Sequence, residues 1–237
     1  MTDTLSSATN SAVVALIRHG DYHQRKGAPS AFQPFSLTPK GTEQAHQCVE
    51  LIRNFCLQSG RNIHPQIHTS ALLRAWQTAK ILANGLLPAQ ALLVETPLLG
   101  ERCVGSLANL TAAEIEAVIK QDPRYPTQPK GWKSDSYYQL PYPGAESLMQ
   151  AGSRVADYLN QLVSDSSDNA NTVHIVVGHG AAFRHAAHLL GTLEFNQIAM
   201  FSMYHATPVF LRRDADLDWH HHSGEWKRRQ SNIRFTD

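Results

Sequence analysis

Short apolar runs alternate with amphipathic stretches from residue 13 to about residue 190. The runs Val13–Ile17 and Thr172–Val177 are almost continuously apolar and rich in β-branched residues, which is typical of strands buried on both faces. Gln66–Thr69 and Ala91–Glu95 predict two shorter strands. Apolar residues spaced three and four positions apart predict helices between Thr38 and Gly60 and over Ala71–Leu82, Glu146–Val163 and Ala181–Leu190.

Several predicted helices have residues suited to their ends. Thr38 before Pro39 predicts an N-cap followed by proline at the first helical position, and Gly60 suits the other end of that helix. Thr111 and Glu114 have the spacing of a capping box, which predicts a helix through Ile119. The next segment, residues 121–143, contains five prolines and is expected to be irregular.

This alternation predicts an α/β fold with three αβα layers, a mostly parallel central sheet and helices on both faces. The segment of about residues 100–145 is expected to be an inserted lid over the strand ends. Residues 1–12, rich in Ser, Thr and Asn, predict a flexible tail before a single domain over 13–237. Val209–Arg212 and Glu225–Arg229 are candidates for the last strands.

Charge, cysteine spacing and the lengths of the apolar runs exclude several classes of protein. The formal net charge of the 237 residues is +1, so no broad attraction to nucleic acid or an anionic membrane is expected. The three cysteines lack CxxC spacing, which favours a reducing compartment over a disulfide scaffold. No apolar run approaches the length of a membrane span, and the first residues do not resemble a signal peptide. We expect a cytoplasmic protein, a monomer or a homodimer.

Two of the predicted strands end in the same way. The first ends in Arg18-His19-Gly20 and the other in Gly178-His179-Gly180, each followed by a loop or a helix. Ligands of open α/β sheets bind at the carboxyl ends of the strands, so the two imidazoles are expected at one edge of the sheet. The helix after Gly180 is expected to point free N–H groups at the same edge, and Gly20 is expected to let backbone approach a ligand.

Arg74 lies in the first turn of a helix that follows a strand, and its guanidinium can reach the same edge. A lone arginine there is more often solvated, and a lone strand-end histidine is more often structural. Together, two arginines and two histidines suit a tetrahedral dianion such as phosphate better than a flat carboxylate.

Four ordered segments resemble the motifs of the histidine phosphatase superfamily, also called the phosphoglycerate mutase-like family. They are Leu16–Gly20, Leu37–Ala45, Thr69–Ala79 and Gly178–Gly180. The resemblance implies that His19 is a nucleophile that becomes phosphorylated. It also implies that Arg18, Arg74 and His179 hold the phosphoryl oxygens, with Gly20 and Gly180 in the same substrate-binding motifs. A charged His179 beside a neutral His19 is expected, because an imidazolium stabilises the phosphoryl charge.

Two further segments match this resemblance. Glu101–Leu107 resembles the acid-bearing stretch of the family, which nominates Glu101 to protonate the leaving group. Pro143–Ser147 resembles a Gly-Glu-Ser element with an alanine inserted. No cofactor is expected. No metal is expected either, because the arginines supply positive charge and His220–His222 reads as an exposed run of imidazoles on a tail.

Departures from the family pattern bear on the reaction. Arg25 stands where the family often has asparagine; it either adds an anion contact or faces solvent. The basic residues by which glycolytic mutases hold a second phosphate and a carboxylate are not evident, which favours a phosphatase. Three hypotheses follow, in this order: a metal-independent phosphomonoesterase acting on a small phosphorylated substrate; a cofactor-dependent mutase or a sugar bisphosphatase; and a non-catalytic phosphate-binding module.

Overall fold

A six-stranded sheet with the strand order β3-β2-β4-β1-β6-β7 forms the centre of the computed structural model. The structure describes residues 11–29, 32–87, 89, 91–165 and 171–229. Its strands are β1 (Ala12–Arg18), β2 (Asn62–Ser70), β3 (Leu92–Thr96), β4 (Thr172–Gly178), β6 (Pro208–Arg213) and β7 (Trp219–Ser223). β3, β2, β4 and β1 are parallel, whereas β6 and β7 are antiparallel additions. The predicted mostly parallel sheet is therefore confirmed.

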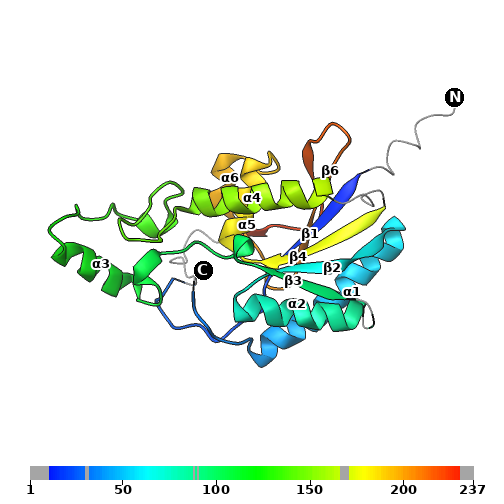
Figure 1. Ribbon diagram of the computed structural model, residues 1–237, viewed down its shortest axis with the longest axis horizontal. Helices are drawn as coiled ribbons and strands as arrows, with labels where there is room; N and C mark the ends of the chain where they lie inside the picture. Colours follow the sequence, from blue (N-terminus) through cyan, green and yellow to red (C-terminus); the bar gives the residue numbers. More distant parts are fainter. Residues whose placement is uncertain (1–10, 30–31, 88, 90, 166–170, 230–237) are drawn as a thin grey trace.

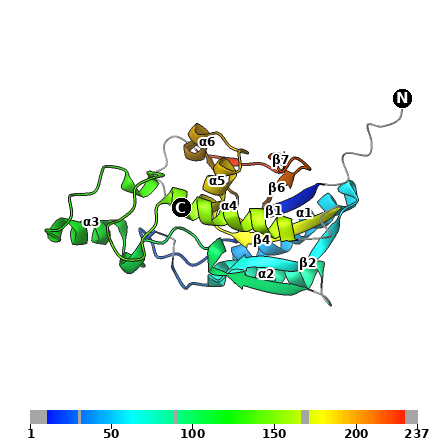
Figure 2. The same cartoon turned by 45° about the horizontal axis from the view of Figure 1, so that its top comes forward.

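Helices cover both faces of this sheet, as expected (Figures 1 and 2). α1 and α2 pack on one face, and α4 and α5 on the other. The helices are α1 (Pro39–Ser59), α2 (Leu73–Leu86), α3 (Ala112–Gln121), α4 (Leu148–Asp165), α5 (Gly180–Leu189) and α6 (Phe195–Met200). The capping predictions hold, since Thr38 accepts from the N–H of Gly41, Gly60 adopts a left-handed conformation, and Thr111 and Glu114 form the capping box.

The alternation of side chains along β1 explains why the sheet has a helix layer on each face. Val13, Ala15 and Ile17 belong to the core under α1 and α2, whereas Val14 and Leu16 belong to the core under α4 and α5. All five are fully buried. Successive strand residues point to opposite faces, so an unbroken apolar run requires cover on both.

The segment after β3 forms a separate part of the molecule that extends away from the sheet in Figure 1. It begins with the 3-10 turns η1 (Pro97–Leu99) and η2 (Gly105–Leu107), continues through α3, and includes a third turn, η3 (Trp132–Ser134). Its own small apolar core comprises Val104, Leu107, Ile115, Ile119, Trp132, Leu140 and Ala145. The predicted irregular proline-rich stretch corresponds to the loops on either side of η3.

Some boundaries differ from the sequence prediction. Ala12 begins β1 and Ser11 is buried, so neither belongs to the predicted tail, and residues 1–10 lie outside the described part. The predicted strand near 225–229 is only β8 (Lys227–Arg228), which pairs with β5 (Phe201–Ser202). Among the described helices, none has the length and apolarity needed to cross a membrane.

Candidate active site

The register of the central strands brings the predicted functional residues together. Arg18 at the end of β1 pairs with Gly178 at the end of β4, and Thr69 on β2 pairs with Val177 on β4. His19 and His179 therefore leave neighbouring strands at the same edge, and their ring centroids lie 5.1 Å apart. Arg18, His19, Arg74 and His179 are called the strand-end cluster below.

The hydrogen bonds of His19 define which of its nitrogens is unprotonated. Nδ1 lies 2.7 Å from the carbonyl oxygen of Gly20, which can only accept, so Nδ1 carries the proton. Nε2 lies 3.0 Å from Nε of Arg74, which can only donate, so Nε2 presents its lone pair. The unprotonated Nε2 is the nitrogen that a nucleophile requires.

Arg74 is fully buried and joins the two histidines. Its Nε donates to His19, its Nη2 donates to Nδ1 of His179 at 3.2 Å, and its Nη1 donates to the carbonyl of Gln33 at 3.0 Å. The guanidinium also lies 4.6 Å from the ring centroid of Tyr22. These contacts fix the plane of the guanidinium beside the reactive nitrogen of His19.

His179 is neutral in this arrangement, contrary to the expected imidazolium. Its Nδ1 accepts from Arg74, so its Nε2 carries the proton and donates to the hydroxyl of Ser70 at 2.9 Å. Burial and the positive charges of Arg74 and Arg18 hold the pKa of His179 well below its ordinary value of 6.5. Burial and Arg74 likewise lower the pKa of His19, against its hydrogen bond to Gly20. A bound dianion would oppose both shifts.

Glycines in the two His-Gly motifs make room for protein groups. A Cβ on Gly20 would lie 2.4 Å from the carbonyl oxygen of Gly41 at the start of α1, and the N–H of Gly20 donates to Thr78. A Cβ on Gly180 would lie 3.2 Å from Cδ of Arg18. The close approach expected between Gly20 and a ligand is thus taken up by α1, and Gly180 accommodates the stem of Arg18. Arg18 itself donates to the carbonyl of Met203.

Glu101 is buried at the amino end of α5. Its Oε1 accepts from the N–H groups of Arg102 and Ala182, and its Oε2 accepts from the N–H of Ala181. The N–H groups that the sequence analysis expected to be free for a ligand are therefore bound to this carboxylate. The reason is favourable electrostatics, since a carboxylate stabilises the positive end of the helix dipole. Because α5 follows His179 directly, Glu101 lies close to the strand-end cluster.

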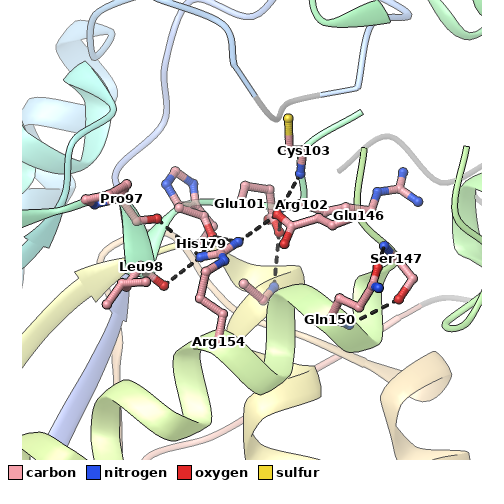
Figure 3. A network of polar contacts seen from close by, with 12 residues as sticks. Pro97, Leu98, Glu101, Arg102, Cys103, Glu146, Ser147, Gln150, Arg154 and His179 are labelled. Carbon is pink, nitrogen blue, oxygen red and sulfur yellow. Dashed lines mark hydrogen bonds and ion pairs between the residues drawn. The ribbon is translucent and has the colours of Figure 1, made fainter. Parts of the chain in front are cut away.

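A partly buried ion pair holds the segment 97–103 that carries Glu101 (Figure 3). Arg154 on α4 donates to the carbonyls of Pro97, Leu98 and Gly100 and to Oε1 of Glu146 at 2.7 Å. The same Glu146 oxygen accepts from the N–H of Cys103 at 2.9 Å. Glu146 is the acid of the predicted Gly-Glu-Ser element, and the structure gives it a positioning role.

The loop of residues 21–36, called the covering loop, lies over the strand-end cluster. Within its described part, Tyr22, Ala28 and Gln33 are buried. His19 is only 2% exposed, and Arg74 and His179 are not exposed at all. The carbonyl of Gln33 accepts from Nη1 of Arg74, so it occupies one of the N–H groups by which this guanidinium could bind a phosphoryl group.

Comparison with known proteins agrees with this geometry. A model of the histidine phosphatase superfamily (branch 1) matches residues 14–221. The chain belongs to this superfamily. Its members are enzymes that act as phosphatases or mutases, and the matched range includes the whole strand-end cluster and Glu101.

The relatives in the superfamily differ in their named activities. The 2,3-bisphosphoglycerate-dependent phosphoglycerate mutase of Parvibaculum lavamentivorans is 24% identical over 203 residues, covering 85% of this chain and 90% of the relative. A mycobacterial glucosyl-3-phosphoglycerate phosphatase is 22% identical with a TM-score of 0.64, covering 88% of this chain and 96% of the relative. A putative alpha-ribazole-5'-P phosphatase from Escherichia coli is 19% identical with a TM-score of 0.65, covering 96% of this chain and 100% of the relative. Related structures hold inorganic phosphate or 3-phosphoglyceric acid.

The structure also places Arg25, for which the sequence left two alternatives, and the three consecutive histidines, which were expected on a tail. Arg25 is exposed and donates to Glu114 at 3.2 Å and to the carbonyl of Asn109, so it ties the covering loop to the segment around α3. His220–His222 lies on the edge strand β7 and not on a tail, and His220 pairs with Asp214 at 2.6 Å. The anion-binding role of Arg25 stays a prediction.

Other residues at the site were not assigned from the sequence. Ser70 orients His179, Gln33 contacts Arg74, and the ring of His205 lies 5.7 Å from that of His19. The sequence could have identified Ser70, because it ends a strand, β2, that neighbours β4. The sequence could not have identified Gln33, because it contacts Arg74 through its main-chain carbonyl, which every residue has.

Proposed function

We propose that this protein is a metal-independent phosphomonoesterase that acts through a phosphohistidine at His19. The observation that supports the proposal most directly is the lone pair on Nε2 of His19, held within a cluster of two guanidiniums and a second imidazole. Neutral imidazole is a nucleophile, and fixed positive groups stabilise the charge of a phosphoryl group in transfer. Arg18 and Arg74 supply positive charge that a metal ion supplies in other phosphatases.

The reaction divides into two displacements. In the first, Nε2 of His19 forms a bond to phosphorus as the bond from phosphorus to the ester oxygen breaks, and the departing alkoxide takes a proton from Glu101. In the second, water attacks phosphorus, gives its proton to Glu101 and breaks the phosphorus–nitrogen bond. Inorganic phosphate leaves, and His19 and Glu101 return to their starting states.

Glu101 has one oxygen better suited to this proton transfer. Oε1 accepts two main-chain N–H groups, whereas Oε2 accepts one. A carboxylate oxygen has two lone pairs, so Oε2 keeps one for a proton. We assign the proton-transfer role to Oε2.

The test is a His19→Ala variant assayed with 4-nitrophenyl phosphate and followed by quenched incorporation of labelled phosphate. We expect the wild type to give an acid-labile phosphoprotein and the variant to give neither label nor turnover. A matched His23→Ala variant, which changes an exposed histidine in the covering loop, should still give the label. Full turnover by His19→Ala would overturn the proposal.

A mutase is the second candidate, because the named sequence relatives are phosphoglycerate mutases. It would pass the phosphoryl group from His19 to a bound acid in place of water. Incubation with 3-phosphoglycerate and a bisphosphoglycerate primer separates the two activities. Net isomerisation indicates a mutase, whereas release of inorganic phosphate alone indicates a phosphatase.

A further inference from the structure

Ser70 is a fully buried serine at the end of β2, and two N–H groups donate to its hydroxyl oxygen. One is Nε2–H of His179, at 2.9 Å, and the other is the main-chain N–H of Leu72, at 3.3 Å. A hydroxyl oxygen has two lone pairs, so these two donors use both of them. Toward any further group, the hydroxyl of Ser70 can act only as a donor.

The hydrogen of this hydroxyl has no acceptor among the residues that the structure describes. The two described partners of the hydroxyl are both donors, and Nε2 of His179 cannot accept while it carries its own proton. A buried donor that lacks an acceptor costs free energy. The present arrangement therefore satisfies the ring of His179 but leaves Ser70 with an unused donor.

The other tautomer of His179 would satisfy both groups. With the proton on Nδ1, the unprotonated Nε2 would accept from the hydroxyl of Ser70, and the hydroxyl oxygen would still accept from Leu72. Arg74 opposes this tautomer in the structure, because its Nη2 donates to Nδ1 at 3.2 Å and a guanidinium cannot accept. Ser70 and Arg74 thus favour opposite tautomers of the same ring.

A bound phosphoryl group would change which tautomer is favoured. A guanidinium N–H binds an anionic oxygen more strongly than a neutral ring nitrogen, so Nη2 of Arg74 would turn to the phosphoryl group. Nδ1 of His179 lies beside that nitrogen and would then direct its lone pair at an anionic oxygen, which is repulsive. A proton on Nδ1 turns the repulsion into a hydrogen bond.

The charges around His179 favour a neutral ring over an imidazolium in this state. Two guanidiniums of the strand-end cluster already balance the charge of a phosphoryl dianion, so the ligand needs no third cation. Burial and the nearby arginines hold the pKa of His179 well below 6.5. Glu101 is the carboxylate at this edge, and its oxygens are bound by main-chain N–H groups. The other charged or titratable neighbours are Arg18 at the end of β1, His19 just after it, Arg74 on α2 and Arg154 on α4.

We propose that Ser70 is a positioning residue that lets neutral His179 change tautomer when a phosphoryl group binds, so that Nδ1–H donates to a phosphoryl oxygen while Ser70 donates to Nε2. The Nε2–H bond breaks and gives its proton to water, and Nδ1 takes a proton from water, so the charge of the ring is unchanged. This inference rests on the proposed function, which places a phosphoryl group at the strand-end cluster. His179 then acts as a neutral hydrogen-bond donor and not as a cation.

The first test observes the tautomer directly and needs no turnover. The probe is sulfate, a tetrahedral dianion that does not titrate near neutral pH. Long-range ¹⁵N–¹H correlation spectra of protein with ¹⁵N-labelled histidine distinguish the Nε2–H form, the Nδ1–H form and the imidazolium. His179 is assigned as the ring whose signals are missing from a His179→Gln variant. We expect the Nε2–H form without sulfate and the Nδ1–H form at saturation, with no change at His174, which is buried within β4.

Three outcomes of that experiment would contradict the inference. They are an imidazolium at His179, an Nε2–H form that persists at saturation, and signals of His179 that do not respond to sulfate at all.

A Ser70→Ala variant tests whether the serine controls this change. Without the hydroxyl, the Nδ1–H form gains no donor at Nε2, so sulfate measured by calorimetry should bind about tenfold more weakly. A larger share of His179 should also stay in the Nε2–H form at saturation. The matched control is Ser11→Ala, which removes another buried hydroxyl that accepts a hydrogen bond, from Arg61. This control should keep the wild-type affinity.

The spectra separate the role of Ser70 from a purely structural one. A Ser70→Ala protein that changes tautomer as completely as the wild type, or that binds sulfate equally well, would refute the assignment of Ser70.

Labelling separates this inference from the proposed function. A wild type that forms the acid-labile phosphoprotein at His19 but shows an imidazolium at His179 would overturn the inference alone. The expected tautomer change in a protein that never forms a phosphohistidine would overturn the proposed function alone.

Discussion

Two groups of buried histidines lie on the same sheet, and only one of them has the features of an active site. His19 and His179 stand just beyond the ends of β1 and β4, in contact with Arg74. His68 and His174 lie within β2 and β4 and are buried as well. Nδ1 of His68 bonds to the hydroxyl of Tyr158 on α4 at 2.7 Å, and the ring of His174 stacks on His64 at 4.7 Å.

The comparison shows that a depressed pKa alone does not identify a reactive histidine. Burial lowers the pKa of His68 to about 4 and that of His174 to about 3, and it also dominates at His19 and His179. What differs is the neighbourhood, since guanidiniums surround one pair and a tyrosine and another histidine surround the other. Position at a strand end and a fixed cationic partner distinguish the candidate functional pair from the other buried histidines.

The largest expected effect comes from Arg74, which has no counterpart in the second group. A lysine at this position cannot contact His19 and His179 together, because one ammonium replaces a planar fork. We expect Arg74→Lys to lower kcat/KM for 4-nitrophenyl phosphate by about 10³-fold. The exposed Arg53→Lys is the control, and circular dichroism should show that both variants are folded. Loss of less than about tenfold would place Arg74 outside the reaction.

The second group should affect stability more than activity. The pKa of about 4 for His68 lies below the value of 6.5 expected in the unfolded chain, so the unfolded state binds a proton first as the pH falls. This contribution to stability is complete above pH 6.5 and is lost progressively toward pH 4, by on the order of 3 kcal/mol. Urea unfolding at a series of pH values measures it.

A His68→Gln variant tests whether the second group contributes to stability and not to activity. It removes the titrating ring, so the free energy of unfolding should fall less steeply between pH 6.5 and pH 4 than in the wild type. Because the side chain of His68 contacts Tyr158 on α4 and not the strand-end cluster, kcat for 4-nitrophenyl phosphate at pH 7 should stay within about threefold of the wild-type value. An unchanged pH slope would show that His68 does not contribute.

Glu101 tests whether the first group performs catalysis or only binds phosphate. Glu101→Gln keeps acceptor oxygen and shape but cannot transfer a proton, so hydrolysis of an alkyl phosphate should fall about 10²-fold or more. The fall should be smaller for 4-nitrophenyl phosphate, whose leaving group needs no proton. Equal rates for wild type and variant with both esters would favour a role for Glu101 in capping α5 alone.

A smaller loss of activity than at Glu101 is expected at the ion pair that holds the Glu101 segment. Glu146→Gln keeps an acceptor for Cys103 but loses the charge that pairs with Arg154. We expect about a tenfold fall in kcat for an alkyl phosphate with little change in KM, because Glu101 is displaced and the strand-end cluster is not. A matched Glu50→Gln variant, which changes the exposed ion pair with Arg53, should leave kcat unchanged.

The sequence predicted the strand-end cluster because its residues occupy positions that any parallel strand defines. The apolar runs of β1 and β4 each stop at His-Gly, and a predicted strand before α2 placed Arg74 at the same edge. β7 was missed because only Trp219 is buried in it, and its exposed histidines give no apolar alternation. The pocket beside Glu101 could not be predicted because its lining residues Arg102, Lys133 and Arg184 meet only through the folding of the segment around η3 onto α5. No local pattern encodes that encounter.

The carbonyl of Gln33 occupies a hydrogen-bond donor of Arg74 that a bound phosphate group could also use. A phosphate oxygen that binds this N–H of Arg74 replaces the carbonyl oxygen of Gln33. The measured affinity is therefore the free energy of the new contact less that of the contact with Gln33. A substitution that moves the main chain at Gln33 should therefore change the affinity for phosphate while every reacting group stays the same.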